Sequence, residues 1–340
     1  MSKIIISGGL GFIGTNLISE LLKENHQILN LDKNGYSSNK FFLRSEKNYQ
    51  LIKFDISLFN QNKLDKIVKK FQPKFLINLA AESHVDRSIE TPFKIANQNI
   101  SLTIKLLISS LRYQKYKKNF KFVHIGTDEI YGDINLSSDY KFNESSCIKP
   151  NNPYSASKAS CNNFVRAFHK TYNLNSLIIN PANNYGEFQL PEKFIPRSIM
   201  SLIQNKPVEI YGSGKNMRNW THVSDTVNGI KTILKKGKNG EIYNISSNDC
   251  LSNNHIVKLL KANYFKYFKK RSRVKYVQDR PGHDLKYSLN NNKLKKLGWK
   301  PKIKFSTGIQ KTFEWYLNKE NLQYFSNLKN LKNRIGKSLL

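Results

Sequence analysis

The chain has 340 residues, and its 56 Lys and Arg against 24 Asp and Glu give a formal net charge of +32 at pH 7. Hydrophobic residues make up 39% of the chain and charged residues 24%, which excludes wholesale disorder. This length allows one large domain or two lobes around a substantial core.

The positive charge by itself could indicate a nucleic-acid partner or an anionic surface. The basic residues, however, are spread along the chain in pairs and triplets, with no long basic block. This spread favours solvated Lys side chains, with attraction of a phosphorylated substrate as a secondary benefit. No nucleic-acid partner is therefore predicted.

Cysteine usage and the N-terminal segment bear on location. Cys147, Cys161 and Cys250 have no CxxC spacing and no companion His cluster, so neither a disulfide framework nor a metal site is expected. The chain starts directly with an expected strand and has no signal-peptide layout. No apolar run approaches the ~18 residues that span a bilayer. These features predict a cytoplasmic protein without a membrane partner.

A glycine-rich turn follows the first expected strand. The strand expected at Lys3–Ser7 has a continuous apolar run of three isoleucines, and Gly8, Gly11 and Gly14 follow as GxxGxxG. The apolar spacing from Thr15 to Leu22 predicts a helix after the turn. Strand, glycine turn and helix form a pyrophosphate site, because glycines let the ligand approach N–H groups at the positive helix end.

Two further strands end in acidic residues. The strand expected at 27–31 ends in Asp32, which can accept hydrogen bonds from a ribose 2′-OH and would repel a 2′-phosphate. This favours NAD over NADP, although Lys33 weakens the exclusion. The strand expected at 49–54 ends in Asp55 and Ile56, where an adenine ring would lie.

The next segment predicts a helix at 62–71, a buried strand at 75–79 and a long helix at 93–112. Between the last two, residues 80–88 suit a loop that lets the dinucleotide cross the sheet edge. A lone histidine is more often structural than catalytic, so His84 is expected to be a structural residue.

A strand expected at 121–125 delivers Thr127, Asp128 and Glu129 to its C-terminal end. In an open α/β sheet this is the usual place for chemistry. Asp128 and Glu129 could supply an acid and a base, the pair that an elimination requires.

Tyr154 and Lys158 stand at i and i+4, on one face of an expected helix. A tyrosine with its ordinary pKa near 10 is a poor base, but an adjacent ammonium and a positive nicotinamide both stabilise the phenolate. Thr127 could share the substrate hydroxyl and complete a site for alcohol oxidation. With the glycine turn and Asp32, this set points to an extended short-chain dehydrogenase/reductase.

Alternation of strand and helix over residues 1–180 predicts an NAD-binding Rossmann domain, a doubly wound parallel sheet in the α/β class. Residues 181–320 are expected to form a smaller, mixed α/β substrate-binding lobe that is interleaved with the first. Residues 321–340 read as a C-terminal extension containing an amphipathic helix with a basic face.

The chain resembles the dTDP-glucose 4,6-dehydratase family over about residues 1–318. The motifs that carry the resemblance are AAESHVDRSI at 80–89, TDEIYG at 127–132, PYSASKAS at 153–160, NNYG at 183–186, PEKFIP at 191–196, GKNMRNW at 214–220 and DRPGHD at 279–284. The resemblance implies conversion of dTDP-glucose to the 4-keto-6-deoxy sugar on a permanently bound NAD. It also implies a homodimer through a helix bundle, to which the helices at 93–112 and 156–172 could contribute.

In this reading Thr127, Tyr154 and Lys158 oxidise C4, Glu129 removes the C5 proton and Asp128 protonates the departing C6 hydroxyl. The resemblance and the glycine turn together assign the cofactor to Gly8, Gly11, Phe12, Ile13, Gly14, Asp32, Lys33, Asp55, Ile56, Leu79, Ala80, Ala81, Tyr154, Lys158 and Asn184. The resemblance assigns the sugar nucleotide to Ser83, Thr127, Asn183, Lys193, Phe194, Glu209, Tyr211, Arg218, Asn253, Arg280 and His283. Arg218 and Arg280 also suit phosphate by their guanidinium shape.

Several positions depart from the usual family pattern: Gly126 for Ser, Asn219 for Asp, Asn34-Gly35 for Leu-Thr and Ser246-Ser247 for Gly-Gly. They leave the preferred base and sugar open, so a dehydratase for another nucleotide hexose is an alternative. A C4-epimerase would not need Asp128 and Glu129, and a UDP-glucuronate decarboxylase has no leaving hydroxyl for Asp128. A non-catalytic NAD- or nucleic-acid-binding protein is the remaining alternative.

Overall fold

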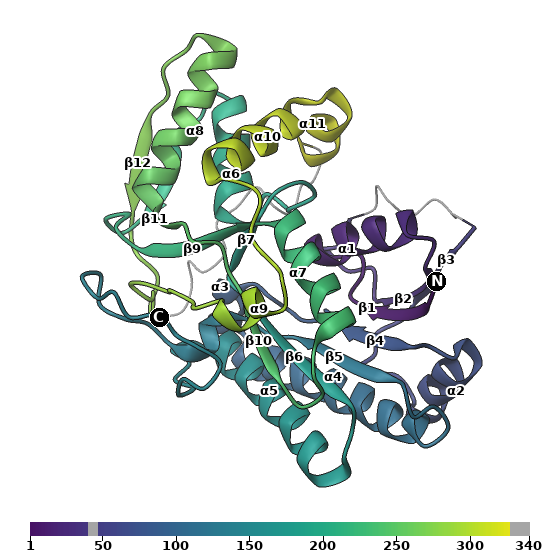
Figure 1. Cartoon of the computed structure of the whole chain (residues 1–340). Helices are drawn as coiled ribbons and strands as arrows, with labels where there is room; N and C mark the ends of the chain where they lie inside the picture. The colour runs from purple at the N-terminus through teal and green to yellow at the C-terminus, as the bar shows by residue number, and fades with distance from the viewer. Residues whose placement is uncertain (40–46, 327–340) are drawn as a thin grey trace.

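The computed structural model describes residues 1–39 and 47–326 and contains a seven-stranded, wholly parallel sheet (Figure 1). Its strand order is β10-β6-β5-β4-β1-β2-β3. The strands are β1 (Lys3–Ser7), β2 (Gln27–Asp32), β3 (Tyr49–Lys53), β4 (Phe75–Asn78), β5 (Lys121–Ile125), β6 (Ser176–Pro181) and β10 (Ile242–Ile245). The predicted doubly wound Rossmann sheet is confirmed.

The central strands are short apolar runs because both faces of the sheet are covered. In β1, Ile4, Ile5 and Ile6 are each at most 1% exposed. The strand order reverses between β1 and β4, which pair directly although helices and two other strands separate them in sequence. Such a reversal opens a crevice at the carboxyl ends of the strands, where ligands bind in sheets of this kind.

Helices cover the sheet in two layers (Figure 1). One layer contains α1 (Phe12–Lys23), α7 (Val223–Lys236) and the short α9 (Asn292–Lys296). The other contains α2 (Gln61–Phe71), α4 (Pro92–Gln114) and α5 (Pro153–Tyr172). Each helix buries one apolar face: Leu17 and Ile230 pack in the first layer, Leu106 and Val165 in the second.

A smaller lobe packs around its own apolar core beside the carboxyl edge of the sheet. Its strands form a three-stranded sheet ordered β11-β9-β7 and a two-stranded sheet ordered β12-β8. The strands are β7 (Asn183–Tyr185), β8 (Val208–Tyr211), β9 (Met217–His222), β11 (Cys250–Ser252) and β12 (Val274–Val277). The helices are α6 (Phe194–Ile203), α8 (Asn253–Phe268), α10 (Phe305–Leu317) and α11 (Lys319–Ser326).

The two lobes exchange chain segments. After β9 the chain returns to the first lobe as α7 and β10, and β10 pairs with β6 at the sheet edge. The sheet therefore takes its seventh strand from residues beyond 180, the expected end of the first domain. The domain boundaries stay a prediction. Of the expected C-terminal extension, α11 covers the residues up to Ser326, and 327–340 lie outside the described residues.

One local expectation was wrong. Residues 80–88 were expected to form a loop, but α3 (Val85–Glu90) begins within this segment. Six residues are too short for a helical period to show in the sequence. The Ser88 N–H donates to the His84 carbonyl at 3.0 Å, and the Ser88 hydroxyl donates to the Val85 carbonyl at 2.7 Å, which closes the turn.

Among residues 1–39 and 47–326, no helix is both long and apolar enough to cross a membrane.

Candidate active site

The glycine turn between β1 and α1 requires the absence of side chains. Gly8 has a φ of +75°, and a Cβ there would lie 2.5 Å from the Ala80 nitrogen, across the β1–β4 crevice. Gly11 caps α1 without any side-chain hydrogen bond, and the first turn of α1 has no acidic residue. The positive end of α1 is thus open to an anionic group.

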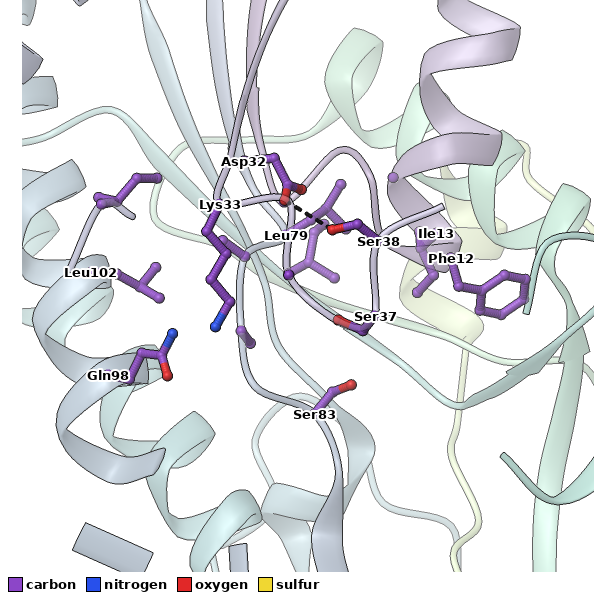
Figure 2. Close-up of a pocket in the computed structure, with 18 of the residues that line it drawn as sticks. Phe12, Ile13, Asp32, Lys33, Ser37, Ser38, Leu79, Ser83, Gln98 and Leu102 are labelled. Atoms are coloured by element: carbon purple, nitrogen blue, oxygen red, sulfur yellow. Dashed lines mark hydrogen bonds between the residues drawn. The ribbon is translucent and has the colours of Figure 1, made fainter. Parts of the chain in front are cut away.

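Asp32 lies where β2 ends, beside this turn. Its carboxylate accepts hydrogen bonds from the Leu10 N–H at 3.0 Å and the Asn34 N–H at 2.8 Å. It also accepts from the Ser38 hydroxyl at 3.3 Å, the bond that is drawn in Figure 2. Burial raises the pKa of this carboxyl, and the two N–H groups oppose that shift. The side chain is therefore held rigidly at the edge of the crevice.

A first cavity of about 230 Å³ follows the crevice (Figure 2). Of the residues predicted to bind the cofactor, it is lined by Gly8, Gly11, Phe12, Ile13, Gly14, Asp32, Lys33, Asp55, Ile56, Leu79, Ala80, Ala81, Tyr154 and Lys158. Glycines at one end, an acidic residue at the strand end and apolar walls fit a dinucleotide.

The cavity also has walls that the sequence did not indicate. Gln98 and Leu102, one turn apart on α4, face the cavity, as Figure 2 shows. Gln189, Leu190 and Glu192 line it from the smaller lobe. The helix at 93–112 was predicted, but its orientation towards the crevice depends on how α4 packs on the sheet.

A second cavity of about 210 Å³ adjoins the first and shares Ser83, Gln189, Glu192 and Lys193 with it. Predicted substrate residues that line it are Ser83, Asn183, Lys193, Phe194, Glu209, Tyr211, Arg218, Asn253, Arg280 and His283. Asn184, predicted for the cofactor, lines this second cavity instead of the first. Its side chain donates to the Ala182 carbonyl at 2.8 Å and accepts from the Thr226 hydroxyl at 2.5 Å, and these bonds hold it there.

Cationic side chains surround the second cavity. Arg218 is 5% exposed, donates to the Asp284 carbonyl at 2.7 Å and lies over the Tyr287 ring. Arg280 lies 3.5 Å from Asp86, and the Lys193 ammonium donates to the Ser83 carbonyl at 2.8 Å. Guanidinium groups fixed by backbone carbonyls are well suited to phosphate.

Thr127, Asp128 and Glu129 follow β5 and begin the short 3₁₀ helix η1 (Asp128–Tyr131). The Thr127 hydroxyl accepts from the Glu129 N–H at 3.4 Å and donates to Asp128 Oδ1 at 3.3 Å. Asp128 is 2% exposed, and its Oδ2 has no partner among the described residues. Only Glu129 of these residues lines the second cavity.

The two carboxyls have different surroundings. Burial and the neighbouring Glu129 carboxylate raise the pKa of Asp128 to about 8. Burial also raises the pKa of Glu129, but Arg280, Arg218 and Lys193 all oppose the shift. At neutral pH Asp128 therefore holds its proton, and Glu129 is the carboxyl that nearby cations favour as an anion.

Tyr154 and Lys158 both line the first cavity from α5, whose Asn152 forms a capping box with Ser155. Burial raises the pKa of Tyr154, and the charge of a Glu129 carboxylate raises it further. Burial lowers the pKa of Lys158. A cationic group in the cavity is thus needed before the phenol can give up its proton easily.

Two histidines border the second cavity. His84 is 8% exposed, and its Nδ1 has no hydrogen bond to any residue that the structure describes. Burial, with Lys193 and Arg87, lowers its pKa to about 2. His283 Nδ1 lies 2.6 Å from Asp279, and burial lowers its pKa to about 4. Both rings are neutral at pH 7, so neither adds to the positive charge of the cavity.

A family model described as GDP-mannose 4,6 dehydratase matches residues 5–312. The chain is 40% identical to a dTDP-glucose 4,6-dehydratase of Haemophilus influenzae, over 93% of this chain and 98% of the relative. It is 33% identical to the crystal structure of DesIV, a dTDP-glucose 4,6-dehydratase from Streptomyces venezuelae with NAD bound. That structure superposes with a TM-score of 0.87 over 96% of this chain and all of the other.

A more distant likeness is to the UDP-glucose 4-epimerase of Thermotoga maritima, at 26% identity and a TM-score of 0.83. The match covers 92% of this chain and 98% of the epimerase. Dehydratases and an epimerase thus share this fold, so the reaction must be argued from the site.

Proposed function

The chain belongs to the GDP-mannose 4,6 dehydratase family, and we propose that it is an NAD-dependent dTDP-glucose 4,6-dehydratase. It converts dTDP-glucose to dTDP-4-keto-6-deoxyglucose and water, as a step towards deoxysugars. One observation carries the proposal: Asp128, whose pKa is raised to about 8, adjoins Glu129, which lies near the cations Arg280, Arg218 and Lys193. Both acids lie close enough to Tyr154 to affect its pKa.

NAD would lie in the first cavity. The glycine turn and the α1 terminus would hold its pyrophosphate, and Asp32 would accept from its adenosine ribose. Bound there, NAD would supply both the hydride acceptor for oxidation at C4 and the hydride donor for reduction at C6, so the reaction would have no net redox change. The protein residues supply the proton transfers and the orientation.

Tyr154 takes the proton of the substrate O4 hydroxyl. The Thr127 hydroxyl lowers the pKa of Tyr154 through a hydrogen bond and orients the substrate O4 hydroxyl. The positive charge of a bound nicotinamide offsets the burial that otherwise keeps the phenol protonated. Both side chains are less than 9% exposed, so water has little access to the reacting atoms.

Elimination follows from the 4-ketone, which acidifies the C5–H. Glu129 takes the C5 proton as a carboxylate, and Asp128 gives its proton to the C6 hydroxyl, which leaves as water. When hydride reaches C6, Glu129 gives its proton back to C5, which completes the 4-keto-6-deoxy sugar. The different surroundings of the two carboxyls match these opposite roles. A 4-epimerase needs neither group, which favours the dehydratase over the fold's other known activity.

The diphosphate of the substrate would lie between Arg218, Arg280 and Lys193, with the hexose towards Ser83 and Thr127. Other predicted contacts to the nucleotide are Asn183, Phe194, Glu209, Tyr211, Asn253 and His283. Asn184, from the second cavity, would contact the inner end of the cofactor where the two cavities meet.

We further propose a homodimer through α4 and α5, without nucleic-acid or membrane partners, in the cytoplasm. Phe93 at the start of α4 is 83% exposed and Phe164 on α5 is 38% exposed, which supports a contact face there. The free thiols of Cys147, Cys161 and Cys250 are consistent with a reducing compartment.

The test is incubation of purified protein with dTDP-glucose without added cofactor. We expect a product lighter by one water, with the alkaline absorbance of a 4-keto-6-deoxy sugar, and NAD retained on the protein. Turnover only with UDP- or GDP-linked sugars would change the assigned nucleotide specificity, while the proposed dehydration reaction would stand. A C4 epimer in place of the dehydrated product would refute the proposed elimination.

A further inference from the structure

A buried polar chain lies behind Lys158, on the side away from the cavity. Lys158 is 3% exposed, and its Nζ donates to the Ile125 carbonyl at 2.7 Å. The same Nζ lies 3.4 Å from Nε2 of His124, which is completely buried on β5. Nothing in the proposed reaction uses this histidine.

The other edge of the His124 ring is also held. Its Nδ1 lies 3.2 Å from Asn78 Nδ2 at the end of β4. Asn78 in turn accepts from the Ser7 hydroxyl at 2.8 Å and donates to the Thr103 hydroxyl at 3.3 Å. All four side chains are at most 1% exposed, so three strands and α4 clamp the imidazole in one orientation.

This arrangement restricts the Lys158 amino group. The lysine side chain is flexible, and the N–H donors of its amino group rotate together about the Cε–Nζ bond. Ile125 and His124, neighbours on β5, engage it from the sheet side. Its remaining direction is the first cavity, which Lys158 lines together with Tyr154.

We propose that His124 is a positioning residue for Lys158: it fixes the amino group so that one N–H direction faces the cofactor and Tyr154. His124 itself contacts neither cofactor nor substrate. The inference rests on the proposed C4 oxidation. It explains why a polar ring stands at a fully buried strand position, where a leucine or valine would otherwise be expected.

Two amide substitutions separate this role from a merely structural one. In His124→Gln the amide can reach the place of Nε2 and keep the contact with Lys158. In His124→Asn the amide reaches only the place of Nδ1, keeping Asn78 and losing Lys158. The readout is the rate at which bound NAD⁺ is reduced after rapid mixing with dTDP-glucose, with KM, NAD content and Tm measured alongside. Val68→Ala, a truncation of a buried side chain that lines neither cavity, controls for lost stability.

We expect His124→Asn to slow cofactor reduction roughly 10- to 100-fold, because small misplacements of a reacting group cost this much. KM should stay near that of the unmodified protein, and His124→Gln should recover most of the rate. Equal rates for the Asn and Gln variants, or rates that only follow Tm as in Val68→Ala, would overturn the inference.

If His124→Asn does not fold, Asn78→Ser is measured in its place. Asn78→Ser removes the contact that holds His124 Nδ1 and leaves the contact between His124 Nε2 and Lys158. A slower reduction then supports the inference, and an unchanged rate refutes it. The proposed function fails separately, when the unmodified protein forms no dehydrated product from any nucleotide hexose.

Discussion

Two adjacent carboxyl groups have different surroundings, although burial raises the pKa of both. Asp128 is sealed from solvent and carries a raised pKa, while Glu129 faces Arg280, Arg218 and Lys193 across the second cavity. Desolvation disfavours an anion, and nearby cations favour it. Environment alone can thus turn chemically similar side chains into an acid and a base.

The pH dependence of kcat should report both groups. Asp128 must be protonated, and its pKa is about 8, so activity should fall about tenfold per pH unit above that value. Glu129 must be ionised, and its pKa is raised, so the acid limb should lie above the ordinary range of a glutamate. Asp128→Asn should lower kcat by about 10²- to 10³-fold and remove the alkaline limb.

The control is Asp139→Asn, which makes the same change of charge at an exposed position. It should retain the profile of the unmodified protein. An alkaline limb that persists in Asp128→Asn would show that another group supplies the proton.

Glu129→Gln should separate oxidation from elimination. The amide cannot take the C5 proton, so dTDP-glucose should reduce the bound cofactor while no dehydrated product forms. The reduced cofactor is followed by its near-ultraviolet absorbance, and product by mass. Glu20→Gln, on the outer face of α1, serves as the comparison. Normal turnover of Glu129→Gln would mean that the base is wrongly assigned.

At the scale of elements, the ligand site depends on a close approach between two strand ends. Gly8 after β1 and Ala80 after β4 lie so near that a methyl group would not fit between them. The approach holds the positive end of α1 over the crevice at the carboxyl edge of the sheet. Turn, strand pairing and helix terminus act as one unit.

Gly8→Ala should therefore damage both stability and cofactor binding. The left-handed backbone and the contact with Ala80 should together cost on the order of 1–3 kcal/mol. Gly11→Ala gives a graded comparison, since its φ is −70° and its nearest contact is the Gly8 carbonyl at 3.3 Å. Thermal unfolding and the NAD content of the purified variants measure the two effects. Equal losses in both variants would contradict this account.

On the scale of the whole molecule, neither lobe is made from one continuous stretch. β10 belongs to the main sheet although β9 and β11 on either side of it belong to the smaller lobe. The Asp225 carboxylate on α7 accepts from the N–H groups of Lys302 and Ile303, each at 3.0 Å, and ties the later chain to the first lobe. The cavities at the junction therefore depend on both lobes folding together.

The proposed dimer is tested by charge placed on its contact face. Phe164→Arg on α5 should shift the protein to monomer, because a buried unpaired guanidinium is costly. Leu58→Arg adds the same charge at a position that is 84% exposed, between β3 and α2. Light scattering coupled to size exclusion measures the mass. A Phe164→Arg variant that stays dimeric would place the interface elsewhere.

The sequence by itself determined the parallel sheet, because its strands are short apolar runs that alternate with segments of helical spacing. The apolar runs and the helical spacing are both local properties of the chain. It also predicted site residues Gly8, Asp32, Tyr154 and Lys158, since each stands at a spacing or strand end that has a direct chemical meaning, and all four line the first cavity. The order of the strands came from the structure alone.

Only the tertiary structure decided which side chains meet. Gln98 and Glu192 line the first cavity, and Asn184 lines the second cavity and not the first. Packing between segments far apart in sequence decides these positions. The different surroundings of Asp128 and Glu129 likewise need burial and cations from other strands and loops. The contact of His124 with Lys158 joins β5 to α5. Such effects depend on distance in space, which no local pattern in the chain encodes.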